Sequence, residues 1–222
     1  MTYELTLRSK QSVTPDTNHY VFNKPEGLEY KPGQATEMTL LKDGWRDEPR
    51  PFTFVSQPEA STLDFVIKSY PDHDGVTEQL AKLEPGDKVE IVAPFGAITD
   101  HGPGVFIAAG AGITPFIPIL EKHNAAGNMD CTLIFSNETE KDIILRETWE
   151  EMEGLKTIFT VTDDKDADVH KERVDKAFLK KNLTRFDQTF YICGPEGFVN
   201  DVRDALKGLG ADADKIVTED GW

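Results

Sequence analysis

The sequence predicts two units of different fold class: an antiparallel β-barrel over residues 1–100 and a doubly wound α/β parallel sheet over residues 104–222. The first hundred residues carry short β-prone segments at close intervals, with room for one helix, which is typical of a small barrel. From Val105 onward, apolar strand segments alternate with helical ones, the pattern of a parallel sheet covered on both faces. Asp100–Gly104 lies between the two patterns and has the composition of a linker.

Local patterns predict the individual elements. Alternating apolar and polar residues at Tyr3–Arg8 predict the first strand, Leu80 and Leu83 predict one short helix, and Pro85–Asp87 predicts a turn. In the first unit we expect strands at 3–8, 19–22, 36–41, 50–56, 63–70 and 88–93, and a helix at 77–83. In the second unit we expect strands at 105–109, 131–136, 157–162, 188–193 and near 215–218, and helices at 115–125, 141–152, 172–181 and 196–207.

The composition is that of a soluble globular protein, with 38% hydrophobic and 29% charged residues among 222. No apolar segment is long enough to span a bilayer, and residues 1–15 lack a signal-peptide core, so the cytoplasm is the expected location. A net charge of −16 argues against nucleic acid and anionic membranes as partners. Cys131 and Cys193 are too few for a disulfide framework, a zinc site or a four-cysteine iron–sulfur cluster, so no metal is expected.

A glycine-rich turn follows the first strand of the second unit. Val105–Ala109 is a short apolar strand, and Gly110-Ala111-Gly112-Ile113 leads directly to Thr114 and Pro115. Thr114 is expected to cap the next helix, with Pro115 in its first position. Such a turn presents backbone N–H groups at the positive end of a helix dipole, a suitable site for a diphosphate. The alternative is a packing turn without a ligand.

Three further motifs carry candidate chemistry. Arg50-Pro51-Phe52-Thr53 combines a phosphate-binding cation, a ring for stacking and a hydroxyl, or is an ordinary strand with one surface arginine. Strict alternation would place Phe52 and Thr53 on opposite faces, so a shared ligand requires a strand edge or end. Gly75-Val76-Thr77 opens the helix, where Thr77 caps it or contacts a phosphate. Cys193-Gly194-Pro195 ends a buried strand at the sheet edge where α/β ligands bind, and Cys193 is otherwise a small buried apolar residue.

In this order and spacing, the motifs resemble the ferredoxin–NADP reductase family over nearly the whole chain, most of all its compact members without an added iron–sulfur or globin domain. The resemblance implies FAD, with FMN as the alternative, and NAD(P)H as co-substrate. It implies that Arg50 to Thr53 bind the flavin, with Arg50 on its phosphate, Phe52 stacked on the ring and Thr53 near N5. Phe52 replaces the commoner tyrosine and keeps the stacking surface.

The same resemblance assigns the remaining binding residues. The flavin's pyrimidine edge is expected beside Val66, Ile67 and Lys68, and a phosphate beside Gly75, Val76 and Thr77. The coenzyme diphosphate is expected beside Gly110, Ala111, Gly112, Ile113, Thr114 and Pro115, with Thr114 near the nicotinamide. Cys193, Gly194 and Pro195 are expected to border the nicotinamide, with the Cys193 thiol near the hydride path.

The adenosine ribose is expected near Ser136, Asn137 and Lys141, as family members read it after the second α/β strand. No arginine stands there for an NADPH 2′-phosphate, and Glu138 and Glu140 would repel one if they faced it, so both coenzymes stay open. At the C-terminus, Trp222 is a candidate to cover the flavin, and Glu219 or Asp220 to lie near N5, with a frayed end as the alternative.

The resemblance implies a flavin-dependent NAD(P)H oxidoreductase that passes hydride from nicotinamide C4 to flavin N5, and electrons onward to ferredoxin or flavodoxin. Those carriers are generally acidic, and a charge of −16 would repel them at long range. The alternatives are a flavin reductase that releases reduced FMN or riboflavin, and a non-catalytic flavin-binding relay subunit.

Overall fold

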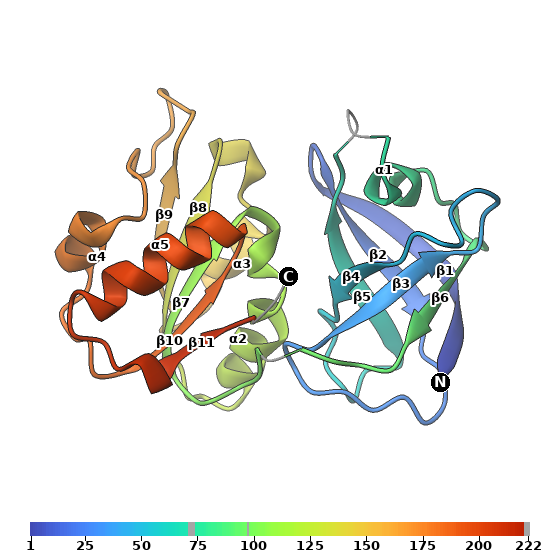
Figure 1. The fold of residues 1–222 in the computed structure, drawn as a ribbon, viewed down its shortest axis with the longest axis horizontal. Coiled ribbons are helices and arrows are strands. Elements are labelled where there is room, and N and C mark those ends of the chain that lie inside the picture. Colours follow the sequence, from blue (N-terminus) through green and yellow to red (C-terminus); the bar gives the residue numbers. More distant parts are fainter. Residues whose placement is uncertain (71–73, 97, 220–222) are drawn as a thin grey trace.

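The computed structural model describes residues 1–70, 74–96 and 98–219, and these form two β-sheets that lie side by side (Figure 1). The first sheet has six antiparallel strands in the order β4-β3-β6-β1-β2-β5 and curls into a near-barrel. The second has five parallel strands in the order β11-β10-β7-β8-β9, with helices on both faces. The predicted fold class is confirmed, and the domain division at 1–100 and 104–222 stays a prediction.

The near-barrel is built from one long strand and five shorter ones around an apolar core that includes Leu5, Phe22 and Phe65. Its elements are β1 (Thr2–Thr14), β2 (Thr17–Asn23), β3 (Ala35–Leu40), β4 (Arg50–Thr53), β5 (Thr62–Lys68), α1 (Val76–Ala81) and β6 (Lys88–Val92). The strand expected at 3–8 extends through Thr14, because its second half pairs with β2 as far as Thr14 opposite Thr17.

Helix α1 closes one end of the barrel, with Val76 and Leu80 buried in the core. The predicted cap at Thr77 is wrong: Gly75 takes the capping position, and Thr77 is the second helical residue. The reason is geometric, since the extended backbone of Gly75 lets its carbonyl accept from the N–H groups of Glu78 and Gln79.

The α/β unit places its central strand, β7, at the switch point of the sheet. Its elements are β7 (Gly104–Ala109), η2 (Gly110–Ile113), α2 (Phe116–Ala125), β8 (Thr132–Asn137), η3 (Glu140–Asp142), α3 (Arg146–Glu151), β9 (Lys156–Val161), α4 (Lys176–Asn182), β10 (Thr189–Cys193), α5 (Glu196–Lys207), η4 (Ala213–Lys215) and β11 (Ile216–Thr218). Helices α2 and α3 pack on one face of the sheet, and α4 and α5 on the other. Ligands of such sheets bind outside the carboxyl ends of the strands at this point.

Two predicted helices differ from the structure. The helix expected at 141–152 is divided into η3 and α3, because Thr139 and Asp142 form a capping box around one 3-10 turn and Leu145 has a left-handed φ of 55°. The helix expected at 172–181 starts only at Lys176, because the Asp175 side chain accepts a hydrogen bond of 2.8 Å from Phe178 N and caps it there.

Helix α2 also packs against the barrel and so fixes the two sheets relative to each other. Val55, Val66 and Ile98 belong to the same buried cluster as Phe116 and Ile117 of α2. This apolar contact leaves the carboxyl ends of the parallel strands facing barrel strands β4 and β5. No helix in the described part of the chain has the length and apolar character needed to cross a bilayer.

Candidate functional site

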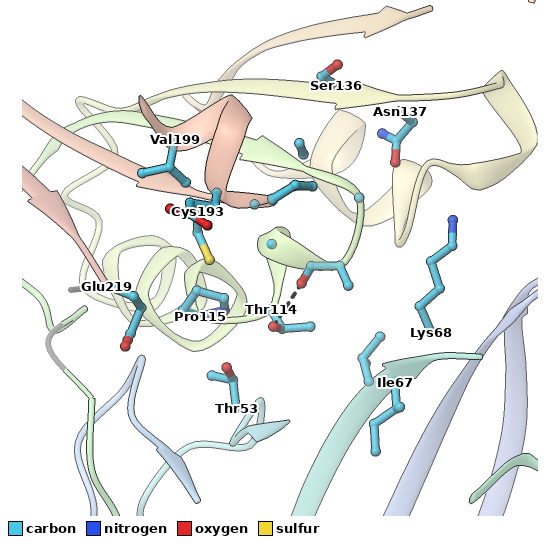
Figure 2. Close-up of a pocket in the computed structure, with 18 of the residues that line it drawn as sticks. Thr53, Ile67, Lys68, Thr114, Pro115, Ser136, Asn137, Cys193, Val199 and Glu219 are labelled. Carbon is cyan, nitrogen blue, oxygen red and sulfur yellow. Dashed lines mark hydrogen bonds between the residues drawn. The ribbon is translucent and has the colours of Figure 1, made fainter. Parts of the chain in front are cut away.

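A cavity of about 990 Å³ lies between the barrel and the carboxyl edge of the parallel sheet, and Figure 2 shows its walls. This volume is at the upper end of the range for small-molecule and cofactor sites, roughly 300–1,000 Å³. The predicted site residues that line it come from every motif singled out in the sequence: Pro51, Phe52, Thr53, Val66, Ile67, Lys68, Thr77, Gly110, Ala111, Gly112, Thr114, Pro115, Ser136, Asn137, Cys193, Gly194, Pro195 and Glu219.

Strands β4 and β5 form the barrel wall of the cavity. Phe52 is half-buried and packs on the barrel core, and Thr53 lies beside it at the end of β4. Strict alternation predicts opposite faces for these two residues, yet both line the cavity. The structure explains this, since β4 is a four-residue strand at the edge of the sheet and ends at Thr53.

The glycine-rich turn forms the opposite wall. Gly110 has a φ of +51°, and nothing lies within 4 Å of where a Cβ would stand, so its backbone is open toward the cavity. The predicted N-cap at Thr114 is wrong: residues 110–113 form a 3-10 turn, Pro115 takes the capping position of α2, and the Thr114 hydroxyl donates to Ala111 O at 3.0 Å. Thr114 still lines the cavity, where Figure 2 shows this bond as a dashed line.

Gly112 joins this turn to the end of β10. A Cβ on Gly112 would lie 2.3 Å from the carbonyl oxygen of Cys193 and 2.6 Å from the nitrogen of Gly194. Only a residue without a side chain permits this approach. Gly112 and Cys193 are 81 residues apart in the sequence, and their two motifs therefore form one continuous backbone surface beside the cavity.

The Cys193 thiol lies between the glycine turn and Glu219 (Figure 2). Burial, with a smaller effect from the nearby Glu219 carboxylate, raises the pKa of Cys193 to about 12 against the opposing hydrogen bond with Gly194. Cys193 is therefore a neutral thiol near pH 7. The Glu219 carboxylate accepts from Ile98 N at 3.4 Å, which connects the end of β11 to the linker between the sheets.

At the other end of the cavity, the polar side chains of Lys68 and Asn137 face each other. Lys68 projects from β5 toward Asn137 at the end of β8 (Figure 2). Its Nζ lies 3.0 Å from the Asp16 carboxylate. Asn137 is 6% exposed, and neither its amide oxygen nor its amide nitrogen has a hydrogen-bond partner among the described residues. Buried polar groups are nearly always paired, so this amide is a ligand-binding candidate.

Five predicted residues lie outside the cavity lining. The side chain of Val76 is buried in the barrel core, and that of Ile113 in the cluster between α2 and the parallel sheet. Arg50 is exposed and pairs with Glu48 at 2.8 Å, while Gly75 precedes α1 and Lys141 is exposed on η3. Trp222 and Asp220 lie outside the described residues.

The cavity is also lined by residues that were not among the predicted site residues: Asp16, Ala35, Ser69, Tyr70, Ala109, Glu138, Thr162, Ile192, Glu196, Val199, Asn200 and Arg203. Most of them come from strand ends or from one face of α5, where neighbours in space are distant in sequence. Asp16 follows Pro15 in a turn-forming pair, and this local signal indicates a turn and not a site.

The walls of the cavity fit a dinucleotide and a flavin. The open backbone at Gly110 and the adjoining 3-10 turn suit a diphosphate, and the unpaired Asn137 amide and the Lys68 ammonium suit polar groups of a nucleotide. Phe52 and Val66 provide apolar surface for a flat ring. Within residues 1–70, 74–96 and 98–219, no group of three or more His, Cys, Asp or Glu side chains is arranged to hold a metal ion.

Comparison with known proteins identifies both units. The family described as Oxidoreductase FAD-binding domain matches residues 4–99, and the family described as Oxidoreductase NAD-binding domain matches residues 106–204. The two matches together extend over most of the chain. They show that the barrel is an FAD-binding domain and the parallel sheet an NAD-binding domain.

Individual relatives agree with this result. NADH-cytochrome b5 reductase 2 of Mycosarcoma maydis is 27% identical, with 96% of this chain and 71% of that protein covered. The CS-b5R domains of human Ncb5or in the NAD+ form match with a TM-score of 0.86 at 25% identity, over 98% of this chain and 69% of that one. A ferredoxin NADP+ reductase from Neisseria gonorrhoeae with bound FAD and NADP shares the fold, with a TM-score of 0.85 at 22% identity over 100% of this chain and 99% of its own. The chain thus belongs to the ferredoxin–NADP reductase-like family of FAD- and NAD-dependent oxidoreductases, together with the cytochrome b5 reductases.

Proposed function

We propose that this protein is an FAD-containing reductase that oxidises NADH and delivers the electrons to a haem protein of the cytochrome b5 type. The observation that supports the reductase activity is that residues of both sheets line one shared cavity. When bound there, the two cofactors supply the redox chemistry, hydride transfer from nicotinamide to flavin and the release of electrons to the acceptor. The protein supplies binding, alignment and shielding from water.

The barrel residues of the cavity serve the flavin in this proposal. Phe52 offers the ring face for stacking, and Thr53 a hydroxyl for a ring nitrogen. Arg50 is exposed, and its ion pair with Glu48 is of the kind that contributes little, about 0–1 kcal/mol. The arginine is therefore free to exchange Glu48 for a flavin phosphate, a stronger bidentate partner.

The residues of the parallel sheet serve the coenzyme. Gly110 to Gly112 present backbone N–H groups, and Thr114 and Cys193 flank the space next to Thr53 (Figure 2). Because the Cys193 thiol is neutral, it offers a small, weakly polar surface beside the hydride path rather than a charge. Lys68 was expected beside the flavin's pyrimidine edge, but its side chain points from the barrel toward Asn137 (Figure 2), and we assign its ammonium to a coenzyme phosphate.

The preference for NADH over NADPH rests on the residues that follow β8. Glu138 lines the cavity beside Asn137, whereas Lys141 lies outside its lining. A 2′-phosphate beside Glu138 would be repelled by that carboxylate, and Lys141 does not line the cavity to offset the repulsion, which disfavours NADPH. Arg203 on α5 also lines the cavity, and its positive charge is the feature that favours NADPH. Its guanidinium is hydrogen bonded to Asn200.

The acceptor is proposed from the relatives, which include an NADH-cytochrome b5 reductase. Ferredoxin and flavodoxin are the second candidates. The charge of −16 repels any acidic carrier at long range, so the rate with such carriers should rise when salt screens the repulsion. The cytoplasmic location stays a prediction.

The test is the absorbance spectrum of the purified protein, followed by anaerobic addition of NADH and, separately, NADPH. The proposal predicts flavin bands near roughly 375 and 450 nm that bleach at lower concentrations of NADH than of NADPH. Reoxidation by cytochrome b5, ferredoxin or flavodoxin then identifies the acceptor. A protein that loses its flavin on gel filtration would be a flavin reductase, and bound flavin that neither coenzyme bleaches would indicate a relay subunit.

A further inference from the structure

The turn between β1 and β2 reaches the cavity, although it belongs to no predicted motif. Asp16 lines the cavity next to Lys68, and the two are neighbours because Thr17 pairs with Lys68 in the β2–β5 register. The backbone adds a second connection, since Ser69 N donates to Asp16 O at 2.7 Å. Asp16 is thus attached to the end of the strand that carries the lysine.

The Asp16 carboxylate is held in a single orientation. Its Oδ1 accepts from the hydroxyls of Thr14 at 2.9 Å and Thr17 at 3.0 Å, and both threonines are buried. This leaves Oδ2 for Lys68, whose Nζ lies at 3.0 Å. Burial alone would raise the pKa of Asp16, but the bonds with Lys68, Thr14 and Thr17 hold it below its usual value.

Lys68 is held in turn. Its side chain is only 16% exposed, and Asp16 takes one of the three N–H donors of the ammonium. The others are left toward the cavity, where Figure 2 shows the side chain pointing at Asn137. Burial would lower the pKa of Lys68, yet the hydrogen bond and charge of Asp16, with a smaller effect from the charge of Asp142 on η3, raise it above its usual value.

We propose that Asp16 is a positioning residue, which fixes the Lys68 ammonium at the barrel edge, facing Asn137, so that it meets the diphosphate of the coenzyme already ordered. A free lysine side chain must give up much rotamer freedom when it binds a phosphate. In this protein that ordering occurs on folding, through Thr14, Thr17 and Asp16. The inference rests on the proposed function, because it takes the coenzyme as the ligand of Lys68.

The alternative is that Asp16 competes with the phosphate for Lys68, and the two roles predict opposite effects. If Asp16 competes, its removal frees the lysine and tightens binding. If Asp16 positions, its removal lets the lysine move and weakens binding. The geometry favours positioning, because the carboxylate is already bound by two buried hydroxyls and an ammonium can bond to Asp16 and a phosphate together.

The test measures the affinity of ADP-ribose and of adenosine for the oxidised, FAD-loaded protein by isothermal titration calorimetry, without turnover. Asp16→Ala should weaken ADP-ribose binding about tenfold, because the lysine must then be ordered on binding, and should leave adenosine binding unchanged. Asp16→Asn keeps an acceptor for Lys68 and should restore most of the affinity. Glu4→Ala is the matched control. Glu4 lies on strand β1 and pairs with Lys88, and its removal should have no effect on either affinity.

A double-mutant cycle with Lys68→Met decides between positioning and a general structural role. Positioning predicts that Asp16→Ala has no further effect on affinity once Lys68 is absent. An equal loss with and without Lys68, or tighter binding in Asp16→Ala, would overturn the proposal. If Lys68→Met alone leaves ADP-ribose affinity unchanged while NADH still bleaches the flavin, this inference fails and the proposed reductase stands. If the protein holds no flavin, the proposed function itself fails.

Discussion

Replacement of Gly112 by alanine tests how the two coenzyme motifs are joined. The added Cβ would lie 2.3 Å from Cys193 O, 2.5 Å from Cys193 C and 2.6 Å from Gly194 N. Carbon contacts are normally about 3.5 Å or more, so the turn and the end of β10 must separate by about 1 Å. All three contacts are with backbone, so no side-chain rotation relieves them.

The expected cost follows from that displacement. Overpacking of this kind costs about 1–3 kcal/mol, which in a chain of this size lowers Tm by about 4–8 °C for 2 kcal/mol. The effect on hydride transfer should be larger, because a misplacement of about 1 Å at a reacting pair can reduce the rate by roughly a hundredfold. We therefore expect the rate of flavin bleaching by NADH to fall much more than the stability.

The assay combines thermal unfolding, flavin content and the anaerobic bleaching rate. Gly197→Ala is the matched control: Gly197 lies in α5, has no positive φ, and has nothing within 4 Å of its Cβ position. That variant should be as stable as the parent or slightly more so, since alanine favours helix over glycine by about 1 kcal/mol. A Gly112→Ala protein with the parent's Tm and bleaching rate would refute the contact described here.

Three further predictions concern single side chains. Arg50→Ala should weaken FAD binding by about 1.5–3 kcal/mol, the value of a hydrogen bond to a charged group, and should leave the Tm of the apoprotein unchanged. Glu48→Ala is the control, and an unaltered flavin content in Arg50→Ala would show that Arg50 does not bind the flavin. Because burial and Glu219 raise the pKa of Cys193 to about 12, its thiol should stay neutral between pH 6 and 9, so iodoacetamide should label it slowly in the native protein and rapidly in denaturant; fast native labelling at pH 8 would contradict this. Glu138→Arg should shift the ratio of kcat/KM for NADPH to kcat/KM for NADH upward by roughly tenfold, since it replaces a repulsion of about 1 kcal/mol on the 2′-phosphate with an attraction. An unchanged ratio would show that the ribose 2′-position of the coenzyme lies away from Glu138.

The sequence predicted the two-unit fold because both units have regular local patterns. Strand β7 is a short apolar run directly followed by glycines, and residues 3–8 of β1 alternate between apolar and polar side chains, so both are visible without tertiary information. The helices were predicted less well where a single residue ends or starts them. Leu145, in a left-handed conformation, and Asp175, as a cap, decide those boundaries.

The candidate site was predictable as motifs but not as geometry. Phe52, Gly110 and Cys193 line one cavity as expected, because each lies at a strand end next to a turn. Periodicity could not place Phe52 and Thr53 together, since that depends on β4 being a short edge strand. Asp16 carries no local signal of function, and its position beside Lys68, 52 residues along the chain, follows from the β2–β5 register.

The central claim is that one cavity brings a nicotinamide from the parallel sheet against a flavin on the barrel. Anaerobic stopped-flow mixing of the FAD-loaded protein with NADH deuterated at either face of C4 tests it directly. The account predicts that the flavin band near roughly 450 nm bleaches, more slowly with deuterium on one face alone, because a fixed cavity presents one face of the ring. Bleaching that is equally sensitive to both faces, or no bleaching by an FAD-loaded protein, would contradict it.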